Sequence, residues 1–328
     1  MSRILVVIAI VLAGCAGPRR KAWKGKDLQA IEEVRRGKRT TASAAWWGSE
    51  GEDDTAPLQA AIHSGARRVI VPNIGRPWVT EPIQLESNQE IVFEKGVVIE
   101  ARPGKFRGPE DSLFTARDKE NIALRGKGAS WVMRKQDYRK PPYAKAEWRM
   151  CLSLLGCHNV KVFGLRLAGS GGDGIYIGRT EKNTGCADIL IRDVVCEDHY
   201  RQGISVISAR NLLVDRCVLR GTEGTAPSAG IDFEPNRADE FLVNCTVRKC
   251  LIEKNAYYGL LFVAGELTEQ SQPVSIRVEN CRVRDNQAGA VEVHPTRAAG
   301  CIELLGNELS GKRQITTNAP NLKVRVRE

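Results

Sequence analysis

The sequence predicts an all-β solenoid, a fold in which a short run of parallel strands repeats and stacks upon itself. Glycine-led strands with alternating apolar and polar residues begin at Gly174, Gly203, Gly230, Gly259 and Gly289. Successive glycines lie 29, 27, 29 and 30 residues apart. Strands with alternating Val, Ile and Leu also begin after Asn159, Asp188 and Asn211. A nearly fixed period of this size in β-type sequence is typical of stacked repeat proteins.

Residues 1–15 read as an export signal. Arg3 is followed by an apolar run from Ile4 to Leu12 and then by small residues, and this run is too short to cross a bilayer as a helix. Leu12-Ala13-Gly14-Cys15 resembles the bacterial lipobox, in which the cysteine is lipidated and becomes the mature N-terminus. We therefore expect an exported lipoprotein anchored to a membrane through Cys15, in the periplasm or at the cell surface. The alternative is a plainly secreted protein.

Residues 16–45 are expected to form a basic tether. Residues 19–39 hold nine Lys and Arg against three Asp and Glu. Beside a lipid anchor this run would lie against anionic head groups, although it would also suit a solvated linker. Residues 1–39 supply +7 of the formal net charge of +10, so residues 40–328 hold only +3. A nearly neutral body permits an acidic polymer as substrate without indicating one, and it argues against nucleic acid as a partner.

The ten cysteines fit a disulfide scaffold poorly. Nine remain once Cys15 is set aside, an odd number in a chain long enough to build a large core. Cys217, Cys250 and Cys281 fall at one position of three successive repeats, and Asn307 takes that position in the next. We expect a stacked column of small buried side chains there, without a redox or metal role. No CxxC pair with the spacing of a zinc site is present.

Residues 46–328 are expected to form one β domain that opens with a short capping helix. Asp53-Asp54-Thr55 is typical of a helix start, apolar residues follow at helical spacing to Ile62, and Gly65 ends the helix. Such a helix would cover the open end of the core, where unpaired strand groups invite edge association. Residues 133–149 break the period and predict a surface excursion beside a groove, or a disordered loop.

Residues from about 50 to 315 resemble the pectate-lyase-like right-handed parallel β-helix proteins. The resemblance is carried by residues 53–62 (DDTAPLQAAI), 67–72 (RRVIVP), 81–101 and the later repeats. It implies a single-stranded right-handed parallel β-helix and a polysaccharide as partner. The superfamily includes polygalacturonases, other glycoside hydrolases, polysaccharide lyases and alginate epimerases, so it implies no single reaction. The ordered motifs of polygalacturonases and the acidic calcium cluster of pectate lyases are missing, so no catalytic residue carries over.

The best-placed pair of acids lies in residues 230–236, GIDFEPN. Strand alternation puts Ile231 and Phe233 on one face and Asp232 and Glu234 on the other, pointing outward together. Hydrolysis of a glycosidic bond needs one protonated and one ionised carboxyl group. Repulsion between two neighbouring acids raises the pKa of one of them. We therefore expect Asp232 and Glu234 to be the catalytic pair, the alternative being a polar pair that caps turn amides.

Neighbouring repeats add candidates for the groove. Aligning residues 289–295 with 230–235 puts Glu292 level with Asp232 and His294 level with Glu234, two coils or roughly 10 Å away. The candidate groove residues are Tyr176, Asp198, His199, Arg201, Tyr257, Glu292 and His294. Asp173 lies in a glycine-rich turn and is interpreted as turn chemistry alone.

Three functions stay open at this point. The first is a monomeric, surface-anchored glycoside hydrolase that uses Asp232 and Glu234 and needs no metal or other cofactor. The second is a lyase or epimerase of uronic-acid polymers, in which His199 or Arg201 removes a proton and Ca²⁺ takes part. The third is a non-catalytic glycan-binding or envelope protein. We expect the first, because two acids share one strand face with a histidine and an arginine nearby.

Overall fold

The computed structural model describes residues 25–49, 51–315 and 319–327. The predicted export signal, the lipobox with Cys15 and the first part of the predicted tether lie outside these residues. None of the helices in the described ranges is both long enough and apolar enough to cross a membrane.

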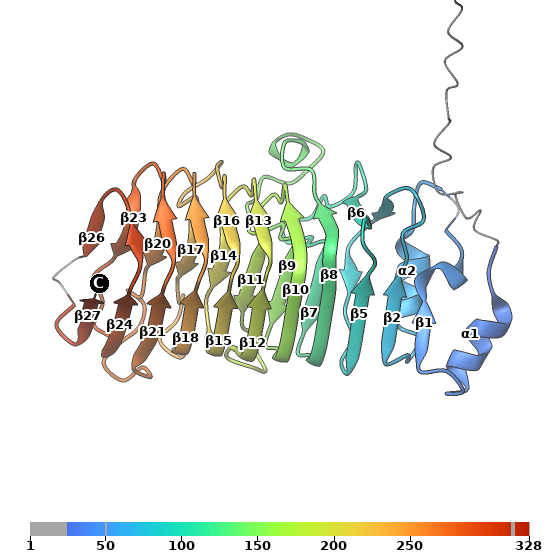
Figure 1. The fold of residues 1–328 in the computed structure, drawn as a ribbon, viewed down its shortest axis with the longest axis horizontal. Helices are drawn as coiled ribbons and strands as arrows, with labels where there is room; N and C mark the ends of the chain where they lie inside the picture. Colours follow the sequence, from blue (N-terminus) through green and yellow to red (C-terminus); the bar gives the residue numbers. More distant parts are fainter. Residues whose placement is uncertain (1–24, 50, 316–318, 328) are drawn as a thin grey trace, which may run out of the picture.

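The described chain is an elongated stack of parallel β coils (Figure 1). Each regular coil gives two strands to an 18-stranded sheet and one strand to a 9-stranded sheet. For example, β12, β13 and β14 of one coil pair in parallel with β15, β16 and β17 of the next. The parallel β solenoid predicted from the glycine spacing is therefore confirmed.

The strands and helices have the following bounds. The 18-stranded sheet contains β1 (Thr41–Ser43), β2 (Arg68–Val71), β3 (Trp78–Thr80), β5 (Gln89–Phe93), β6 (Val98–Ala101), β8 (Glu120–Val132), β10 (His158–Ala168), β12 (Cys186–Arg192), β13 (Val195–Glu197), β15 (Ala209–Asp215), β16 (Val218–Arg220), β18 (Leu242–Arg248), β19 (Leu251–Glu253), β21 (Val274–Glu279), β22 (Arg282–Arg284), β24 (Gly300–Leu305), β25 (Glu308–Leu309) and β27 (Leu322–Arg327). The 9-stranded sheet contains β4 (Ile83–Gln84), β7 (Phe114–Arg117), β9 (Leu152–Leu155), β11 (Ile175–Gly178), β14 (Gln202–Val206), β17 (Ala229–Phe233), β20 (Tyr258–Phe262), β23 (Gly289–Val293) and β26 (Arg313–Ile315). The helices are α1 (Leu28–Arg35) and α2 (Thr55–Ile62), with 3₁₀ turns η1 (Ala44–Trp47) and η2 (Asp137–Arg139).

Inward-facing side chains form apolar ladders that run along the stack. In the 9-stranded sheet, Ile204, Ile231, Leu260 and Val291 lie in register and are buried. In the neighbouring ladder, the rings of Phe233 and Phe262 stack with centroids 5.2 Å apart. Fully burying an apolar side chain of this size stabilises the fold by about 1.5–3 kcal/mol, so the ladders hold successive coils in register.

The Asn and Asp residues that begin the repeats adopt a left-handed backbone conformation. Asn121, Asn159, Asp188, Asn211 and Asn244 have φ angles between 49° and 58°. Asn and Asp tolerate this region better than other residues with a Cβ. Their side chains also bond from coil to coil, as where Asn244 Nδ2 donates to Asn211 Oδ1 at 2.8 Å. This position of the repeat therefore needs both the backbone tolerance and the short polar side chain.

The glycines that lead the strands of the 9-stranded sheet are required for a different reason, which is the lack of space for a Cβ atom. A Cβ atom on Gly174 would lie 2.5 Å from the carbonyl oxygen of Gly203, and one on Gly203 would lie 2.3 Å from that of Gly230. On Gly230 it would lie 2.4 Å from Ile252 Cγ2 and 2.8 Å from the carbonyl oxygen of Gly259. Backbone packs against backbone at this column, so only a hydrogen atom fits between successive coils.

The folded body begins earlier than residue 46, where the sequence analysis placed its start. Helix α1 packs Ile31 and Val34 into the core, and its N-terminus is capped by Asp27, whose Oδ1 accepts from the Ala30 backbone nitrogen at 3.0 Å. Strand β1 pairs in parallel with β2. Most of the described part of the predicted tether is therefore folded. The sequence did not reveal this, because cations dominate the composition of the segment and only Ile31 and Val34 mark its apolar side. Helix α2 is confirmed.

The predicted cysteine column is confirmed. The Cys217 backbone nitrogen lies 3.4 Å from Cys250 Sγ, and that of Cys250 lies 3.5 Å from Cys281 Sγ. Asn307 continues the column, because its Oδ1 accepts from the Cys281 backbone nitrogen at 2.8 Å. All nine cysteines from Cys151 to Cys301 are free thiols.

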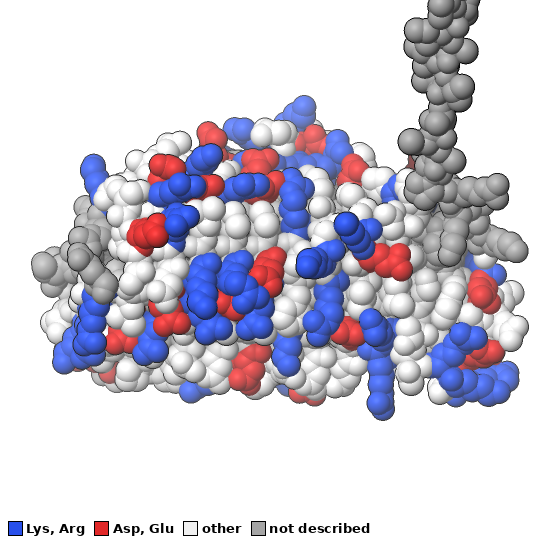
Figure 2. Space-filling model, viewed as in Figure 1, with Lys and Arg blue, Asp and Glu red and all other residues white. Residues whose placement is uncertain are grey.

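Surface charges of both signs are interspersed, as Figure 2 shows on one face of the stack. On the 18-stranded sheet, Glu197 pairs with Arg166 and Arg220 from the coils on either side. Asp215 accepts ion pairs from Arg192 at 2.8 Å and Arg248 at 2.9 Å. These pairs balance charge locally between neighbouring coils.

Residues 133–149 form a folded surface excursion between β8 and β9, which was the first of the two expectations for this segment. Figure 1 shows it rising from the edge of the stack. Tyr138 and Arg149 are buried within it. The Arg149 guanidinium donates to the carbonyl oxygens of Phe106 at 2.8 Å and Arg107 at 3.3 Å, which fixes the excursion to the body.

Candidate functional site

One row of outward-facing residues crosses the 9-stranded sheet at the level of Asp232. We call it the outward row. It consists, strand by strand, of Thr115, Ser153, Tyr176, Ser205, Asp232, Leu261 and Glu292. The predicted register is therefore correct, with Glu292 two strands from Asp232. The Glu234 nitrogen bonds the carbonyl oxygen of Val206 and that of His294 bonds Phe262, so these two residues also share a level.

Asp232 lies on the outward side of the sheet but has no exposed surface. Gln202 Nε2 donates to its Oδ2 at 2.6 Å, and Ser205 Oγ donates to its Oδ1 at 2.6 Å. Burial raises the pKa of Asp232 well above its ordinary value, Arg201 opposes this, and Glu234 adds to it. Asp232 therefore lies on the predicted face of the strand, but it is covered and not open to solvent. Strand alternation fixes the face on which a side chain lies but does not reveal what covers it.

Arg201 joins the acids into one group. Its Nη2 lies 2.7 Å from Glu234 Oε2, and its Nη1 lies 3.6 Å from Asp173 Oδ2. Its Nε lies 3.8 Å from Glu147 Oε1 in the excursion. We call Arg201, Asp173, Asp232, Glu234 and Glu147 the Arg201 cluster. Burial alone would lower the pKa of Arg201, but Asp173, Asp232 and Glu234 outweigh burial and raise it, so the guanidinium stays charged.

The members of the cluster differ in access to solvent. The side chain of Glu234 is 25% exposed and that of Glu147 is 34% exposed. Arg201 is 13% exposed, and Asp173 has no exposed surface. Glu234 is therefore the member of the predicted catalytic pair that a ligand can touch in this conformation.

The sequence-based interpretation of Asp173 as a turn residue alone is wrong. Neither carboxylate oxygen finds a hydrogen-bond donor among the described residues. Burial raises its pKa to about 7, against the opposing effect of Arg201. Asp173 and Gln202 both directly precede a glycine that leads a strand, and the Gly174 nitrogen bonds the Gln202 carbonyl oxygen at 3.0 Å. This shared position, directly before a glycine that leads a strand, was the sequence signal that could have placed Asp173 and Gln202 at the site.

The pKa of Asp173 predicts a pH dependence of stability. The folded protein keeps a proton on Asp173 up to about pH 7, while the unfolded chain releases it near 3.8. This contribution to stability is therefore present below pH 4 and is lost as the pH rises towards 7, amounting to about 4 kcal/mol. In Asp173→Asn the contribution is absent, so the variant should gain stability relative to the wild type from pH 4 to pH 8. Urea unfolding of both proteins at pH 4, 6 and 8 measures this, and a constant difference would contradict a raised pKa.

The turn at residues 198–201 sends its side chains to different places. His199 has no exposed surface, and its Nδ1 lies 2.8 Å from Ser170 Oγ. Burial lowers its pKa to about 3, so the imidazole is neutral and enclosed. The Asp198 carboxylate instead pairs with Lys135 Nζ at 2.7 Å. Of this predicted group only Arg201 joins the cluster, because consecutive residues of a turn do not share one direction.

Tyr257, Glu292 and His294 form a separate polar group at the far end of the outward row. His294 Nε2 lies 3.1 Å from Glu292 Oε2. Burial and a hydrogen bond to Glu292 raise the pKa of Tyr257. Leu261 separates Glu292 from Asp232 in the row, so this group lies apart from the Arg201 cluster.

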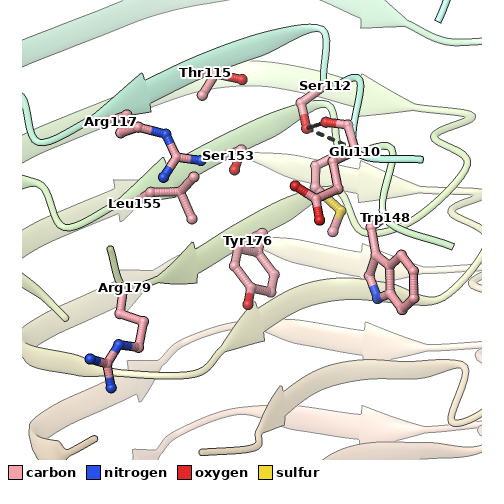
Figure 3. A pocket seen from close by; sticks show the side chains of 10 residues that line it. Glu110, Ser112, Thr115, Arg117, Trp148, Ser153, Leu155, Tyr176 and Arg179 are labelled. Atoms are coloured by element: carbon pink, nitrogen blue, oxygen red, sulfur yellow. Dashed lines mark hydrogen bonds between the residues drawn. The ribbon is translucent and has the colours of Figure 1, made fainter. Parts of the chain in front are cut away.

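A pocket of about 350 Å³ lies on the same face, over β7, β9 and β11. It is lined by Glu110, Ser112, Thr115, Arg117, Trp148, Met150, Ser153, Leu155, Tyr176 and Arg179. Figure 3 shows Tyr176 in the middle, Trp148 on one side, and Arg117 and Arg179 on the other. The volume falls within the usual range for ligand pockets. We call it the aromatic pocket.

Two of its side chains stand out. Trp148 is 46% exposed, which is unusual for so large an apolar residue. Tyr176, predicted as a sugar-stacking aromatic, lines the pocket one strand from Ser205. Trp148 was missed because it belongs to the excursion, whose sequence lacks the repeat pattern. Among the described residues, no group of three or more His, Cys, Asp or Glu side chains is arranged to hold a metal ion.

Comparisons with known proteins agree with this architecture. A family model described as "Right handed beta helix region" matches residues 145–307. Uncharacterized protein YclG of Bacillus subtilis (strain 168) is 27% identical over 166 residues, which are 46% of this chain and 27% of that protein. The chain thus spans about a quarter of the curated relative that it matches.

Solved structures are similar at low sequence identity. An iota-carrageenase complexed to iota-carrageenan fragments aligns with a TM-score of 0.59 and 16% identity, over 78% of this chain and 57% of that chain. A hyperthermoactive exopolygalacturonase from Thermotoga maritima aligns with a TM-score of 0.53 and 16% identity, over 90% of this chain and 80% of that chain. Tailspike protein gp49 of Acinetobacter baumannii bacteriophage Fri1, a capsular polysaccharide depolymerase, aligns with a TM-score of 0.53 and 13% identity. The alignment covers 87% of this chain and 57% of that chain. At these identities the similarity establishes the fold. The chain therefore shares the right-handed parallel β-helix fold with these proteins.

Proposed function

We propose that this protein is a glycoside hydrolase that acts on an extended polysaccharide lying along the outward row. The observation that carries the proposal is the contrast between two acids of one strand. Asp232 is buried with a raised pKa, and Glu234 is partly exposed in an ion pair with Arg201 at 2.7 Å. Glycoside hydrolysis needs this difference, because one carboxyl group donates a proton and the other acts as base or nucleophile.

The burial of Asp232 sets a condition on the reaction. Glu234 can contact a sugar directly, whereas Asp232 can donate its proton only after the site opens. The Arg201 guanidinium bonds both Glu234 and Ser205 Oγ, and Ser205 in turn donates to Asp232. A substrate that displaces Arg201 would therefore uncover Asp232 and free Glu234 in one step, with Arg201 then available to an anionic or hydroxyl group.

The aromatic pocket supplies a place where a sugar unit binds. The rings of Trp148 and Tyr176 offer apolar faces for stacking, with Arg117 and Arg179 at the opposite side (Figure 3). The outward row extends from this pocket past Asp232 to Glu292, roughly 29 Å at 4.8 Å per strand. That length suits a polymer. The carrageenase, the exopolygalacturonase and the capsular depolymerase named above support a polysaccharide as the substrate class. A lipid anchor at Cys15, proposed from the sequence, would hold this groove at a membrane surface.

The lyase or epimerase alternative loses the two bases that the sequence suggested. His199 is enclosed, and the pKa of Arg201 is raised, so its guanidinium holds its proton. No other observation favours elimination over hydrolysis.

A glycan panel tests the proposal. The purified full-length protein is incubated with neutral, uronic and sulfated polysaccharides, and both new reducing ends and the ultraviolet absorbance of unsaturated sugars are followed. We expect new reducing ends without absorbance. Both signals together would establish a lyase instead, and glycan binding without either signal would establish a non-catalytic binder.

A further inference from the structure

A second pocket, of about 530 Å³, lies against the excursion. Its lining residues are Lys135, Tyr138, Arg139, Lys140, Pro141, Tyr143, Lys145, Ala146, Gly171 and Tyr200. It shares no residue with the aromatic pocket. Four of its ten lining residues are Lys or Arg, three are Tyr, and none is acidic. We call it the basic pocket.

Most of the positive charge around this pocket is uncompensated. Lys140 and Lys145 are exposed, and neither they nor Arg139 pairs with a carboxylate among the described residues. Only Lys135 has such a partner, Asp198, at 2.7 Å. On the 18-stranded sheet, by contrast, cations pair with acids of the neighbouring coil, as Arg220 does with Glu197 and Arg277 with Glu303. Three unpaired cations around one cavity repel one another, and an anion bound among them would relieve that repulsion.

The tyrosines that line the basic pocket are held in place by contacts of their own. The rings of Tyr138 and Tyr143 meet edge to face with centroids 5.1 Å apart. The Tyr143 hydroxyl accepts from the Gly104 nitrogen at 2.9 Å, and the Tyr138 hydroxyl accepts from the Arg134 nitrogen at 3.2 Å. The remaining tyrosine, Tyr200, has the Arg139 guanidinium 5.8 Å from its ring centre. Fixed aromatic surface beneath cations suits a sugar ring that bears a negative group.

The excursion brings the two pockets next to each other. Ala146 lines the basic pocket and Trp148 lines the aromatic pocket, and Glu147 between them reaches towards Arg201. Because Ala146 and Trp148 are two residues apart, the two pockets lie near each other on either side of Glu147.

We propose that the basic pocket binds an acidic sugar unit, carrying a carboxylate or a sulfate ester, of the polysaccharide that enters the groove. The inference rests on the proposed function in one respect, namely that the ligand is a saccharide. It adds the charge of that saccharide and a binding site outside the catalytic pair. The body as a whole is nearly neutral, so this selectivity comes from three local cations and not from a general attraction.

The test compares two double variants by isothermal titration calorimetry on the full-length protein in 50 mM NaCl. Lys140→Gln with Lys145→Gln removes two pocket cations, and Lys161→Gln with Lys323→Gln removes two exposed lysines from the 18-stranded sheet as a matched control. The ligands are oligogalacturonate, iota-carrageenan oligosaccharides, neutral agarose oligosaccharides and inorganic sulfate. We expect the pocket variant to lose about tenfold in affinity for one of the acidic oligosaccharides, and the control variant to bind it like the wild type.

Other outcomes overturn the inference. It fails if the two double variants bind the acidic oligosaccharides equally, or if neutral oligosaccharides bind as tightly as acidic ones. Inorganic sulfate that binds as tightly as the oligosaccharides would show a site for small anions and not for a sugar. Equal thermal midpoints of the two variants exclude a loss of folding.

The proposed function is tested separately. If no glycan is cleaved but the pocket variant still loses affinity for acidic oligosaccharides, the inference about the basic pocket holds and the hydrolase proposal fails. If a glycan is cleaved and the pocket variant binds normally, only the inference about the basic pocket falls.

Discussion

Glu234→Gln is expected to lower kcat for glycan cleavage by about 10²–10⁴-fold while KM changes only a few-fold. The substitution keeps the shape of the side chain and removes the carboxylate that a sugar can reach. Its effect falls mainly on kcat because the charge is needed when the glycosidic bond breaks. Initial rates of reducing-end release over a range of substrate concentrations give both constants.

Glu308→Gln is the matched control for this variant. Glu308 is also paired with an arginine, Arg282, at 2.6 Å, but it lies 69% exposed on the 18-stranded sheet. We expect its kinetics to equal those of the wild type. A Glu234→Gln variant that keeps more than about a third of the wild-type rate would remove Glu234 from the catalytic pair and leave Asp232 without a partner.

Gly203→Ala is expected to destabilise the fold by about 3 kcal/mol, at the upper end of the range for overpacked sites. The new methyl group would lie 2.3 Å from the carbonyl oxygen of Gly230. That atom belongs to the backbone of the next coil, so relief requires the coils to separate and their hydrogen bonds to weaken. The midpoint of urea unfolding measures the loss.

The control for this variant is Gly265→Ala, at a glycine in a turn after β20. A Cβ atom there would have its nearest neighbour at 3.8 Å, the carbonyl oxygen of Pro295, so we expect stability within about 0.5 kcal/mol of the wild type. If Gly203→Ala unfolds at the same urea concentration as this control, the close approach of the glycine column does not limit the spacing of the coils.

The repeat was visible in the sequence because each of its landmarks has a strict local cause. Gly203 has no room for a Cβ atom, and Asn211 adopts a left-handed backbone that most residues avoid. Such positions tolerate few residue types, so their spacing survives in the sequence. Helix α1 was missed because Ile31 and Val34 make up only two positions in a run of cations, and burial of a short helix depends on what lies beneath it.

The candidate site was predictable only as far as strand register reaches. Register put Asp232, Glu292 and Tyr176 in one row, as the structure confirms. The turns follow no such rule, so the sequence could not reveal that Arg201 reaches Glu234 while His199 is enclosed. The excursion that brings Trp148 and Glu147 to this face has no repeat at all. Its contribution depends on tertiary contacts such as those of Arg149.

The outward row also fixes the distance between the aromatic pocket and Glu234. The aromatic pocket and Glu234 belong to different coils, with β14 between Tyr176 and Asp232. Inserting or deleting one whole coil between them would leave both intact and shift them apart or together by one strand spacing, about 4.8 Å. For the proposed hydrolase, the distance between the aromatic pocket and Glu234 would therefore change in steps of one strand spacing, and this distance would set the length of the released fragments.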